Sequence, residues 1–262
     1  MRFAAIPDLH APLTHKGYFE WMLRQIEDFR PDVVVNLGDW FEGKPAKRFS
    51  KWPGETWTLE AERRAVADQA EAINAVAPDA KKVWLYGNHD FNQHGDDPDR
   101  VPADYKDSVH WRNHVGLAKA LEGWTVIEKY DHRTSFKLGP VIFQHGCDVA
   151  KNSMQKAAYL YGGPYSLYVC GHTHRIVPVT QAEHLDIPLP YWWANPGCGV
   201  EWDKMRYMDR CSMAKWGRGL VIGEVSDTAV ANRKSTYSSV QWSAEVLVHS
   251  WAHNRPEVKL CR

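Results

Sequence analysis

The stretch Val83-Trp84-Leu85-Tyr86-Gly87-Asn88-His89-Asp90 decides the fold class and places the chemistry of this chain. Its first four residues form a short apolar run, typical of a buried strand, and Gly87 allows a sharp turn where that strand ends. An amide oxygen, an imidazole and a carboxylate then follow one another directly. Polar groups crowded at a strand tip are costly to fold unless they bind something, although these residues alone also fit an Asx turn with a surface histidine.

The same arrangement recurs at four other predicted strand ends, and this favours a binding site over a set of solvated turns. The polar residues that follow the predicted strands 3–6, 32–37, 141–144 and 167–170 are Asp8 and His10, then Asp39, then His145, then His172 and His174. Residues two apart on an extended segment point to the same side, so each D-x-H or H-x-H pair can reach one ion. In open α/β sheets, sites form at the carboxyl ends of the strands.

The apolar periodicity predicts an α/β fold in which strands alternate with helices. A stripe at three- and four-residue spacing predicts helices over 17–29 and 58–76, and weaker patterns predict helices over 108–121 and 153–161. Further strands are predicted over 82–86, 124–127, 133–138, 176–179, 191–194, 219–225 and 244–248, with a loop over 92–102 and a turn over 195–198. A chain of 262 residues with 44% hydrophobic content can form one substantial core, and we predict a single domain over residues 1–262.

Charge and cysteine usage narrow the classes of function. Lysine plus arginine equals aspartate plus glutamate, 32 each, so the chain is a poor candidate for gripping long nucleic acid by phosphate neutralisation alone. The five cysteines have no C-x-x-C spacing, which argues against a disulfide framework and a zinc-thiolate site. With no long apolar run and no signal-peptide pattern, we expect a soluble, cytoplasmic protein without a membrane partner.

The ligand types indicate a two-metal site. Oxygen and nitrogen donors without thiolate suit manganese, iron or zinc. The seven candidate ligands are too many for one tetrahedral ion, so two ions are the natural count. These candidates are Asp8, His10, Asp39, Asn88, His145, His172 and His174.

The order D-x-H, G-D, G-N-H-D, H-G and G-H-T-H resembles that of the calcineurin-like metallophosphoesterases, in particular their small bacterial and phage members. The motifs run from Asp8 to His174. The resemblance implies a four-layer sandwich of two mixed β-sheets flanked by helices. It also implies two divalent metal ions, manganese being favoured over iron, zinc, nickel or magnesium, and hydrolysis of a phosphoester by a hydroxide that bridges them.

Carried over position by position, the resemblance assigns roles to the motif residues. Asp8, His10 and His174 would hold the first ion, and Asn88, His145 and His172 the second. Asp39 would bridge both. His89 would be the catalytic histidine near the scissile phosphate, oriented by Asp90.

The substrate remains open between three alternatives. A phosphodiesterase or nuclease acting on nucleotides or nucleic-acid ends is favoured, because segment 44–57 is basic and rich in tryptophan and could form a lid in which Lys44, Lys47 and Arg48 contact the substrate. An alternative interpretation of the same segment is a surface loop, in which the charged residues are solvated and the tryptophans pack on the core. A phosphomonoesterase for phosphoproteins or small metabolites is the second alternative. The segment from Gly38 to Gly43 lacks the GDxxDRG form of the protein phosphatase branch, which counts against a phosphoprotein substrate. A non-catalytic metal-binding scaffold is the third. The oligomeric state is not predicted.

Overall fold

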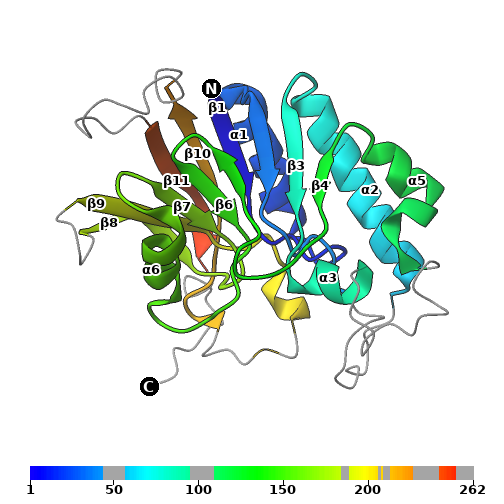
Figure 1. Ribbon diagram of the computed structural model, residues 1–262. Helices are drawn as coiled ribbons and strands as arrows, with labels where there is room; N and C mark the ends of the chain where they lie inside the picture. Colours follow the sequence, from blue (N-terminus) through cyan, green and yellow to red (C-terminus); the bar gives the residue numbers. More distant parts are fainter. Residues whose placement is uncertain are drawn as a thin grey trace.

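The computed structural model describes residues 1–43, 57–94, 109–183, 189–205, 208, 213–226 and 242–251. Two mixed β-sheets lie face to face between helices, which confirms the predicted fold class (Figure 1). The predicted substrate contacts Lys44, Lys47 and Arg48 lie outside the described residues. Among the helices of the described ranges, none combines the length and the apolar character of a transmembrane span.

The first sheet has six strands in the order β11-β10-β1-β2-β3-β4. The four strands β1 to β4 are parallel neighbours, and β10 and β11 add antiparallel strands at one side. Their bounds are Arg2–Ile6 for β1, Val33–Asn36 for β2, Lys81–Leu85 for β3, Thr125–Ile127 for β4, Gly217–Val225 for β10 and Trp242–Trp251 for β11.

The second sheet has five strands in the order β5-β6-β7-β9-β8. Strands β6, β7 and β9 are parallel neighbours, whereas β5 and β8 pair antiparallel with β6 and β9. Their bounds are Phe136–Leu138 for β5, Val141–Gln144 for β6, Leu167–Cys170 for β7, Ile176–Glu183 for β8 and Pro190–Pro196 for β9.

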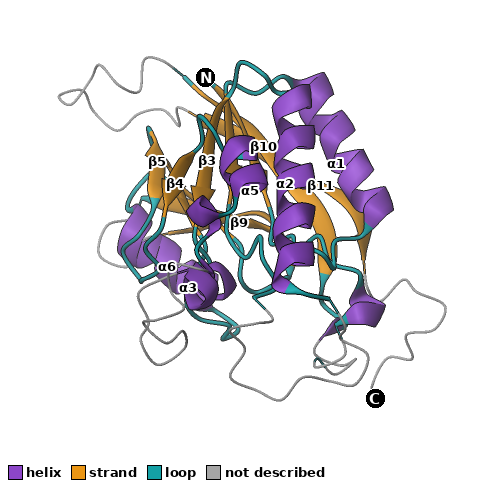
Figure 2. Cartoon of the chain, turned by 90° about the vertical axis from the view of Figure 1, so that its right-hand side faces the viewer, coloured by secondary structure: helices purple, strands orange, loops and turns teal. Residues whose placement is uncertain are grey.

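Helices cover the outer face of each sheet. The helices α1, α2 and α5 lie together on the six-stranded sheet, and α6 lies on the five-stranded sheet (Figures 1 and 2). The helical bounds are Lys16–Phe29 for α1, Leu59–Val76 for α2, Asn88–His94 for α3, Trp111–Asn113 for the 3-10 helix η2, Val115–Ala120 for α5, Ser153–Ala157 for α6, Ala158–Gly162 for the π-helical turn η3 and Trp202–Lys204 for the 3-10 helix η4.

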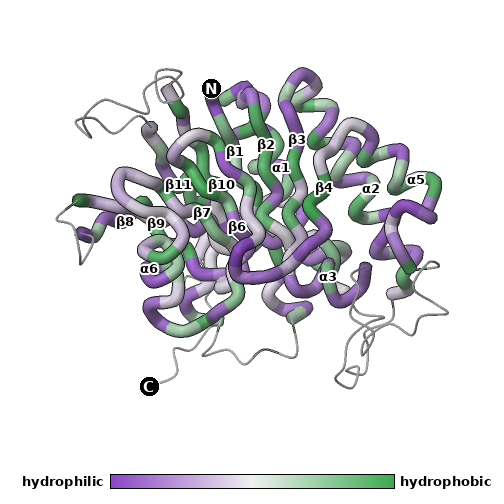
Figure 3. The backbone as a smooth tube through the Cα atoms, in the orientation of Figure 1, coloured by the Kyte–Doolittle hydropathy of each residue, from purple (hydrophilic) through white to green (hydrophobic). Residues whose placement is uncertain are grey.

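Each interface between layers has its own apolar core, and strands β1, β2 and β3 of the first sheet are strongly hydrophobic (Figure 3). Phe3, Val35 and Phe143 pack between the two sheets. Tyr18 and Trp84 belong to the core between the first sheet and its helices. A strand buried on both faces reads as a continuous apolar run, and this is why the valine-rich β2 was predictable from sequence.

Histidines outside the motifs cap helices. The His15 side chain accepts a hydrogen bond from the Tyr18 backbone N–H, 3.0 Å away, at the start of α1. His110 and His114 do the same for η2 and α5. Thr58 caps α2 through the backbone N–H of Ala61. Each cap satisfies a backbone donor that has no partner inside the helix.

Several predicted elements differ in the structure. Helix α3 begins at Asn88 and continues to His94, so the first residues of the predicted loop 92–102 are helical, and residues 95–102 lie outside the described ranges. The predicted helix 108–121 is divided into η2 and α5. The predicted turn at 195–198 is wrong in its first half, because strand β9 continues through Pro196.

Candidate metal centre

The predicted ligands follow strands of both sheets. Asp8 and His10 come after β1, Asp39 after β2 and Asn88 after β3; His145 comes after β6 and His172 and His174 after β7. These strands are parallel neighbours within each sheet, so their carboxyl ends meet at one edge. The structure thus brings the donor groups of all seven predicted ligands together.

One group of donors consists of Asp8, His10 and His174, all buried. His174 Nε2 lies 3.2 Å from Asp8 Oδ2 and 3.0 Å from His10 Nε2. Two imidazole nitrogens at this distance repel each other unless a proton or a cation lies between their lone pairs.

A second group consists of Asp39, His145 and His172, with Asn88 beside them. His145 Nε2 is its centre, 3.3 Å from Asp39 Oδ2, 3.2 Å from Asn88 Oδ1 and 3.2 Å from His172 Nδ1. The other ring nitrogen of His145 donates to the carbonyl of Leu37 at 2.9 Å. That bond fixes the tautomer and leaves Nε2 as the donor atom toward the cluster.

Asp39 lies between the two groups. Its Oδ2 atom is 3.3 Å from His145 Nε2 and 3.9 Å from His10 Nε2. Its Oδ1 atom accepts a hydrogen bond from the backbone N–H of His89 at 2.8 Å. A single carboxylate therefore contacts donors of both groups.

The backbone is strained at four of the candidate ligands. His10, Asp39, His172 and His174 have positive φ values of 49°, 49°, 65° and 58°. A side-chain-bearing residue in this region costs about 1–3 kcal/mol, and such strain persists only where the surroundings enforce it. Its concentration at these positions marks the strand ends as a functional site.

Two glycines of the motifs make room for carboxylates. A Cβ atom at Gly87 would lie 2.1 Å from Asp39 Oδ1, and one at Gly171 would lie 2.1 Å from Asp8 Oδ1. Neither glycine has a positive φ. The chain turns at Gly87, between β3 and α3, as the sequence predicted, but the position requires glycine for its missing side chain and not for an unusual backbone conformation.

His89 lies beside the first group. Its ring packs edge-on against that of His10 at 4.8 Å, and its side chain is 20% exposed, so it faces the opening of the cluster. The Nδ1 atom of His89 donates to the carbonyl of Glu42 at 2.7 Å. This bond directs the opposite ring nitrogen away from the core.

The His89 ring is held by its bond to the Glu42 carbonyl, and the orienting role assigned to Asp90 stays a prediction. The carboxylate of Asp90 is fully buried and accepts hydrogen bonds from four donors of its own. These donors are the backbone N–H groups of Trp40, Phe41 and Gly87 and the indole of Trp84. Asp90 thus joins the turn after β3 to the turn after β2.

Glu42 is a site residue that the sequence interpretation missed. Its carboxylate is fully buried, with Oε2 2.8 Å from His10 Nδ1 and 3.9 Å from His89 Nδ1. The sequence predicted no role for Glu42 in the site. Glu42 lies three residues after Asp39, and no local sequence signal marks it, because its approach to His10 depends on the path of the chain after β2.

Burial and charge set the protonation of the cluster. Burial disfavours the imidazolium of His145, but Asp39 and Asp8 outweigh burial and raise the pKa of His145 to about 9. Burial, and then the neighbouring His145, lower the pKa of His172 to about 4. Burial, and then Asp39, raise the pKa of Asp90 to about 7. The carboxylates therefore create a negative potential that attracts a proton or a cation.

The donor set fits divalent metal ions. Asp8 Oδ1 and His174 Nδ1 are buried and have no hydrogen-bond partner in the described part of the chain. A buried carboxylate oxygen without a partner is costly, and a cation relieves that cost. Carboxylate, amide and imidazole donors suit manganese, iron, zinc or nickel. They differ from the cysteine thiolates of a structural zinc site.

The chain is similar to a known protein family and to several solved structures. Among curated proteins, no match was found. Similar solved structures include the phosphoesterase Yfce from E. coli, with 16% identity, a TM-score of 0.40 and coverage of 92% of this chain and 99% of that chain. They also include Vps29 complexed with zinc from Entamoeba histolytica, with 12% identity, a TM-score of 0.41 and coverage of 95% and 99%. A third is the nuclease MPE from Pseudomonas putida, with 16% identity, a TM-score of 0.35 and coverage of 74% and 71%.

At these levels of similarity the solved structures say nothing about the substrate. The family model is decisive, because the model of the calcineurin-like phosphoesterases matches residues 1–176, which is more than half of the 262 residues. Those residues include the two groups of donors at the carboxyl ends of the strands. The chain therefore belongs to the calcineurin-like phosphoesterase family and is a metal-dependent phosphoester hydrolase.

Proposed function

We propose that the chain is a binuclear metal-dependent phosphodiesterase that acts on nucleotides or on nucleic-acid ends. The observation that supports this proposal is the meeting of seven oxygen and imidazole donors in two groups that share Asp39. A single ion would use only one of these groups. Two ions explain why both are built from buried, strained residues.

The ligands of each ion follow from the two groups. Asp8, His10 and His174 would hold one ion, and Asn88, His145 and His172 the other, with Asp39 shared between them. Manganese is the favoured ion, and iron, zinc, nickel and magnesium fit the same donors. When bound, such ions lower the pKa of water and withdraw charge from phosphoryl oxygens.

The protein residues around the ions bind and orient the substrate. His89 is the proposed catalytic histidine, which would donate a proton to the leaving oxygen or stabilise charge on the phosphoryl group. Its hydrogen bond to the Glu42 carbonyl holds the Nδ1 proton and presents Nε2 for this task. Glu42 in turn holds His10 through its carboxylate and thus orients a proposed metal ligand.

The residues that follow Asp39 argue against a phosphoprotein substrate. The buried Trp40, Phe41 and Glu42 occupy the segment in which the protein phosphatase branch carries its GDxxDRG motif. Trp40 packs on Trp84 and Trp124 in the core. Without the arginine of that motif, a phosphoprotein monoester is a poor fit.

The test measures metal content and ester preference in parallel. We expect the purified protein to carry close to two divalent ions and to hydrolyse bis(p-nitrophenyl) phosphate faster than p-nitrophenyl phosphate. His89→Ala should retain the ions and lose at least 100-fold in turnover, because general acid catalysis contributes about 10²–10⁴-fold. The exposed His249→Ala is the matched control. A strong monoester preference would contradict the diesterase proposal, and one ion or none would contradict the binuclear site.

A further inference from the structure

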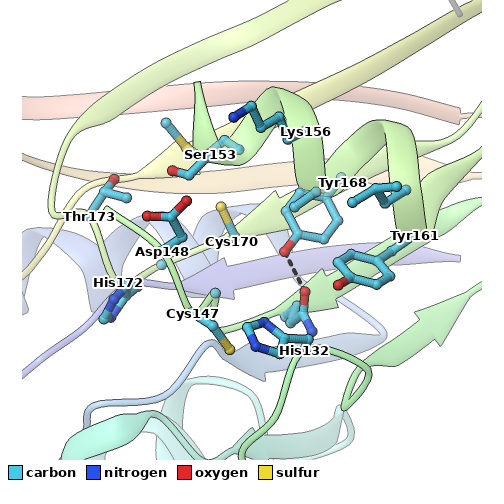
Figure 4. A pocket seen from close by; sticks show the side chains of 16 residues that line it. His132, Cys147, Asp148, Ser153, Lys156, Tyr161, Tyr168, Cys170, His172 and Thr173 are labelled. Atoms are coloured by element: carbon cyan, nitrogen blue, oxygen red, sulfur yellow. Dashed lines mark hydrogen bonds between the residues drawn. The ribbon is translucent and has the colours of Figure 1, made fainter. Parts of the chain in front are cut away.

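A cavity of about 200 Å³ lies next to the proposed metal centre (Figure 4). It is an open pocket lined by α6, by η3, by the residues that follow β6 and by strand β7. His172 belongs to its wall, and the Nδ1 atom of the same histidine faces His145 in the second group of donors. A substituent of a phosphorus atom held at the metal centre could therefore reach this cavity by passing a single side chain.

The lining is largely apolar and aromatic. Tyr168 and Met154 are buried in its wall, and the ring of Tyr161 lies beside that of Tyr168 (Figure 4). The Tyr168 hydroxyl donates to Gln144 Oε1, which fixes the orientation of the ring. Aromatic ring faces such as that of Tyr161 bind flat aromatic groups well.

One polar group in the wall has no partner. The Ser153 hydroxyl is buried, and within the described ranges nothing forms a hydrogen bond with it. A serine at the start of a helix normally bonds to the backbone, so an orphaned hydroxyl in a cavity wall requires an explanation. Because a hydroxyl both donates and accepts, it suits the mixed donor and acceptor edge of a nitrogen heterocycle.

The dimensions set the size of the ligand. Sites that enclose a whole small molecule measure about 300–1,000 Å³, so this cavity holds only one ring-sized part of a larger ligand. Its rim carries the exposed Asp148, Lys156 and Leu160. The wall beside Leu160 is the π-helical turn η3, an irregularity that is frequent at functional sites.

We propose that this cavity is a subsite for the base of a nucleotide substrate, with Tyr161 as the stacking ring and Ser153 as the hydrogen-bonding group. This assignment rests on the proposed function, since it takes the phosphorus atom to be bound at the neighbouring metal centre. It deepens that function by requiring a nucleoside on one side of the phosphodiester.

The first experiment compares two esters that share a leaving group. Thymidine 5′-(p-nitrophenyl phosphate) and methyl p-nitrophenyl phosphate both release p-nitrophenolate from a monoanionic diester, so only the retained group differs. We expect the wild-type protein to have a higher kcat/KM for the nucleoside ester. Ala157→Phe fills the cavity and should lower the ratio of the two kcat/KM values at least tenfold, since stacking of one base is worth about that much.

Two further variants separate the subsite from general damage to the fold. Ser153→Ala removes one hydrogen bond without adding volume and should lower the same ratio about fivefold. Gln155→Phe adds the same ring to the same helix outside the cavity lining and should leave the ratio within twofold. Hexyl p-nitrophenyl phosphate is a third substrate, with an apolar chain in place of the nucleoside. If the wild-type protein hydrolysed it with the same kcat/KM as the nucleoside ester, and Ala157→Phe lowered both values equally, the cavity would be a general apolar pocket and the base assignment would be overturned.

The second experiment detects binding without turnover. Thymidine monophosphate is added to the metal-free protein, and saturation-transfer NMR should show contact with the base protons, lost in Ala157→Phe and retained in Gln155→Phe. If both esters are hydrolysed but the ratio does not respond to Ala157→Phe, the subsite is wrong and the proposed function stands. If neither ester is hydrolysed but thymidine monophosphate binds as expected, the subsite stands and the proposed function is wrong.

Discussion

At the scale of single residues, the site depends on two glycines, whose lack of a side chain leaves room for the carboxylates of the proposed ligands. Gly171 lies against the carboxylate of Asp8, and Gly87 lies against that of Asp39. The closest approach in each case is to a carboxylate oxygen of a proposed metal ligand. These glycines therefore set how deeply the carboxylates sit between the strand ends.

The first prediction concerns Gly171→Ala. The new Cβ would lie 2.1 Å from Asp8 Oδ1, so the carboxylate or the strand end must move. We expect a loss of about 1–3 kcal/mol in unfolding free energy, as for overpacking elsewhere in a core, and at least a tenfold loss in metal affinity. Thermal unfolding and metal titration measure the two effects.

The matched control is Gly116→Ala in α5. Its Cβ would come no closer than 3.4 Å to a neighbouring atom, and alanine favours a helix over glycine by about 1 kcal/mol. This variant should be slightly stabilised and should bind metal normally. Equal metal affinity in Gly171→Ala and Gly116→Ala would show that the space beside Asp8 is not needed.

The residues of the site were predictable only where the chain repeats a local pattern. Asp8, Asp39 and His172 each follow an apolar strand, so their convergence could be expected from the geometry of a parallel sheet. Glu42 follows no strand directly. Its contact with His10 depends on the path of the turn after β2, which local sequence does not specify.

At the scale of elements, helix α3 shows where periodicity fails. Its residues Asn88–His94 include no apolar stripe, so the sequence gives no helical signal. The helix is held by tertiary hydrogen bonds instead. Asp90 fixes its first turn to neighbouring turns, and His94 fixes its end through a contact with the Val109 carbonyl at 3.1 Å. Strands such as β6, buried on both faces, were by contrast predicted with correct bounds.

The second prediction concerns the buried end of α3. Burial, and then the neighbouring His110, hold the pKa of His94 well below its ordinary value of 6.5. The neutral ring donates to Val109 from Nδ1 and accepts from the Gln93 side chain at 3.3 Å. Protonation would break the second of these bonds.

The sign of the pH dependence follows from proton linkage. Below pH 6.5 the unfolded chain binds a proton at His94 and the folded chain does not, so stability falls as the pH falls, by up to about 1.4 kcal/mol per pH unit. His94→Gln keeps a hydrogen-bonding side chain and removes this titration. Denaturant unfolding from pH 7 to pH 5 should therefore show a shallower loss in His94→Gln than in the wild type, and parallel curves would contradict the assignment.

At the scale of the whole molecule, the two sheets meet at the proposed metal centre. The first sheet supplies Asp8, His10, Asp39 and Asn88, and the second supplies His145, His172 and His174. Away from this edge, contact between the sheets is apolar, with Phe3 and Phe143 packed at 5.2 Å. The assignment of strands to two sheets did not follow from hydrophobic pattern. It came from the family resemblance, because pairing across distant segments leaves no local trace.

The third prediction follows from this division of ligands between the sheets. Each proposed ion is held by residues from both sheets, so metal binding should stabilise the packing of one sheet on the other. A ligand that binds only the folded state at 100 times its dissociation constant adds about 2.7 kcal/mol. Manganese should therefore raise the unfolding midpoint of the metal-free protein in a concentration-dependent way, and a chelator should reverse the rise.

The variants show whether the two sheets are coupled through the site. Asp39→Asn alters the residue shared by both groups and should abolish most of the manganese effect, whereas His174→Ala and His172→Ala should each remove about half. Asp68→Asn, an exposed change on α2, is the control and should respond as the wild type does. If His172→Ala responded fully to manganese while His174→Ala did not respond at all, a single ion held by the first group would account for the stabilisation, and the second group would need another role.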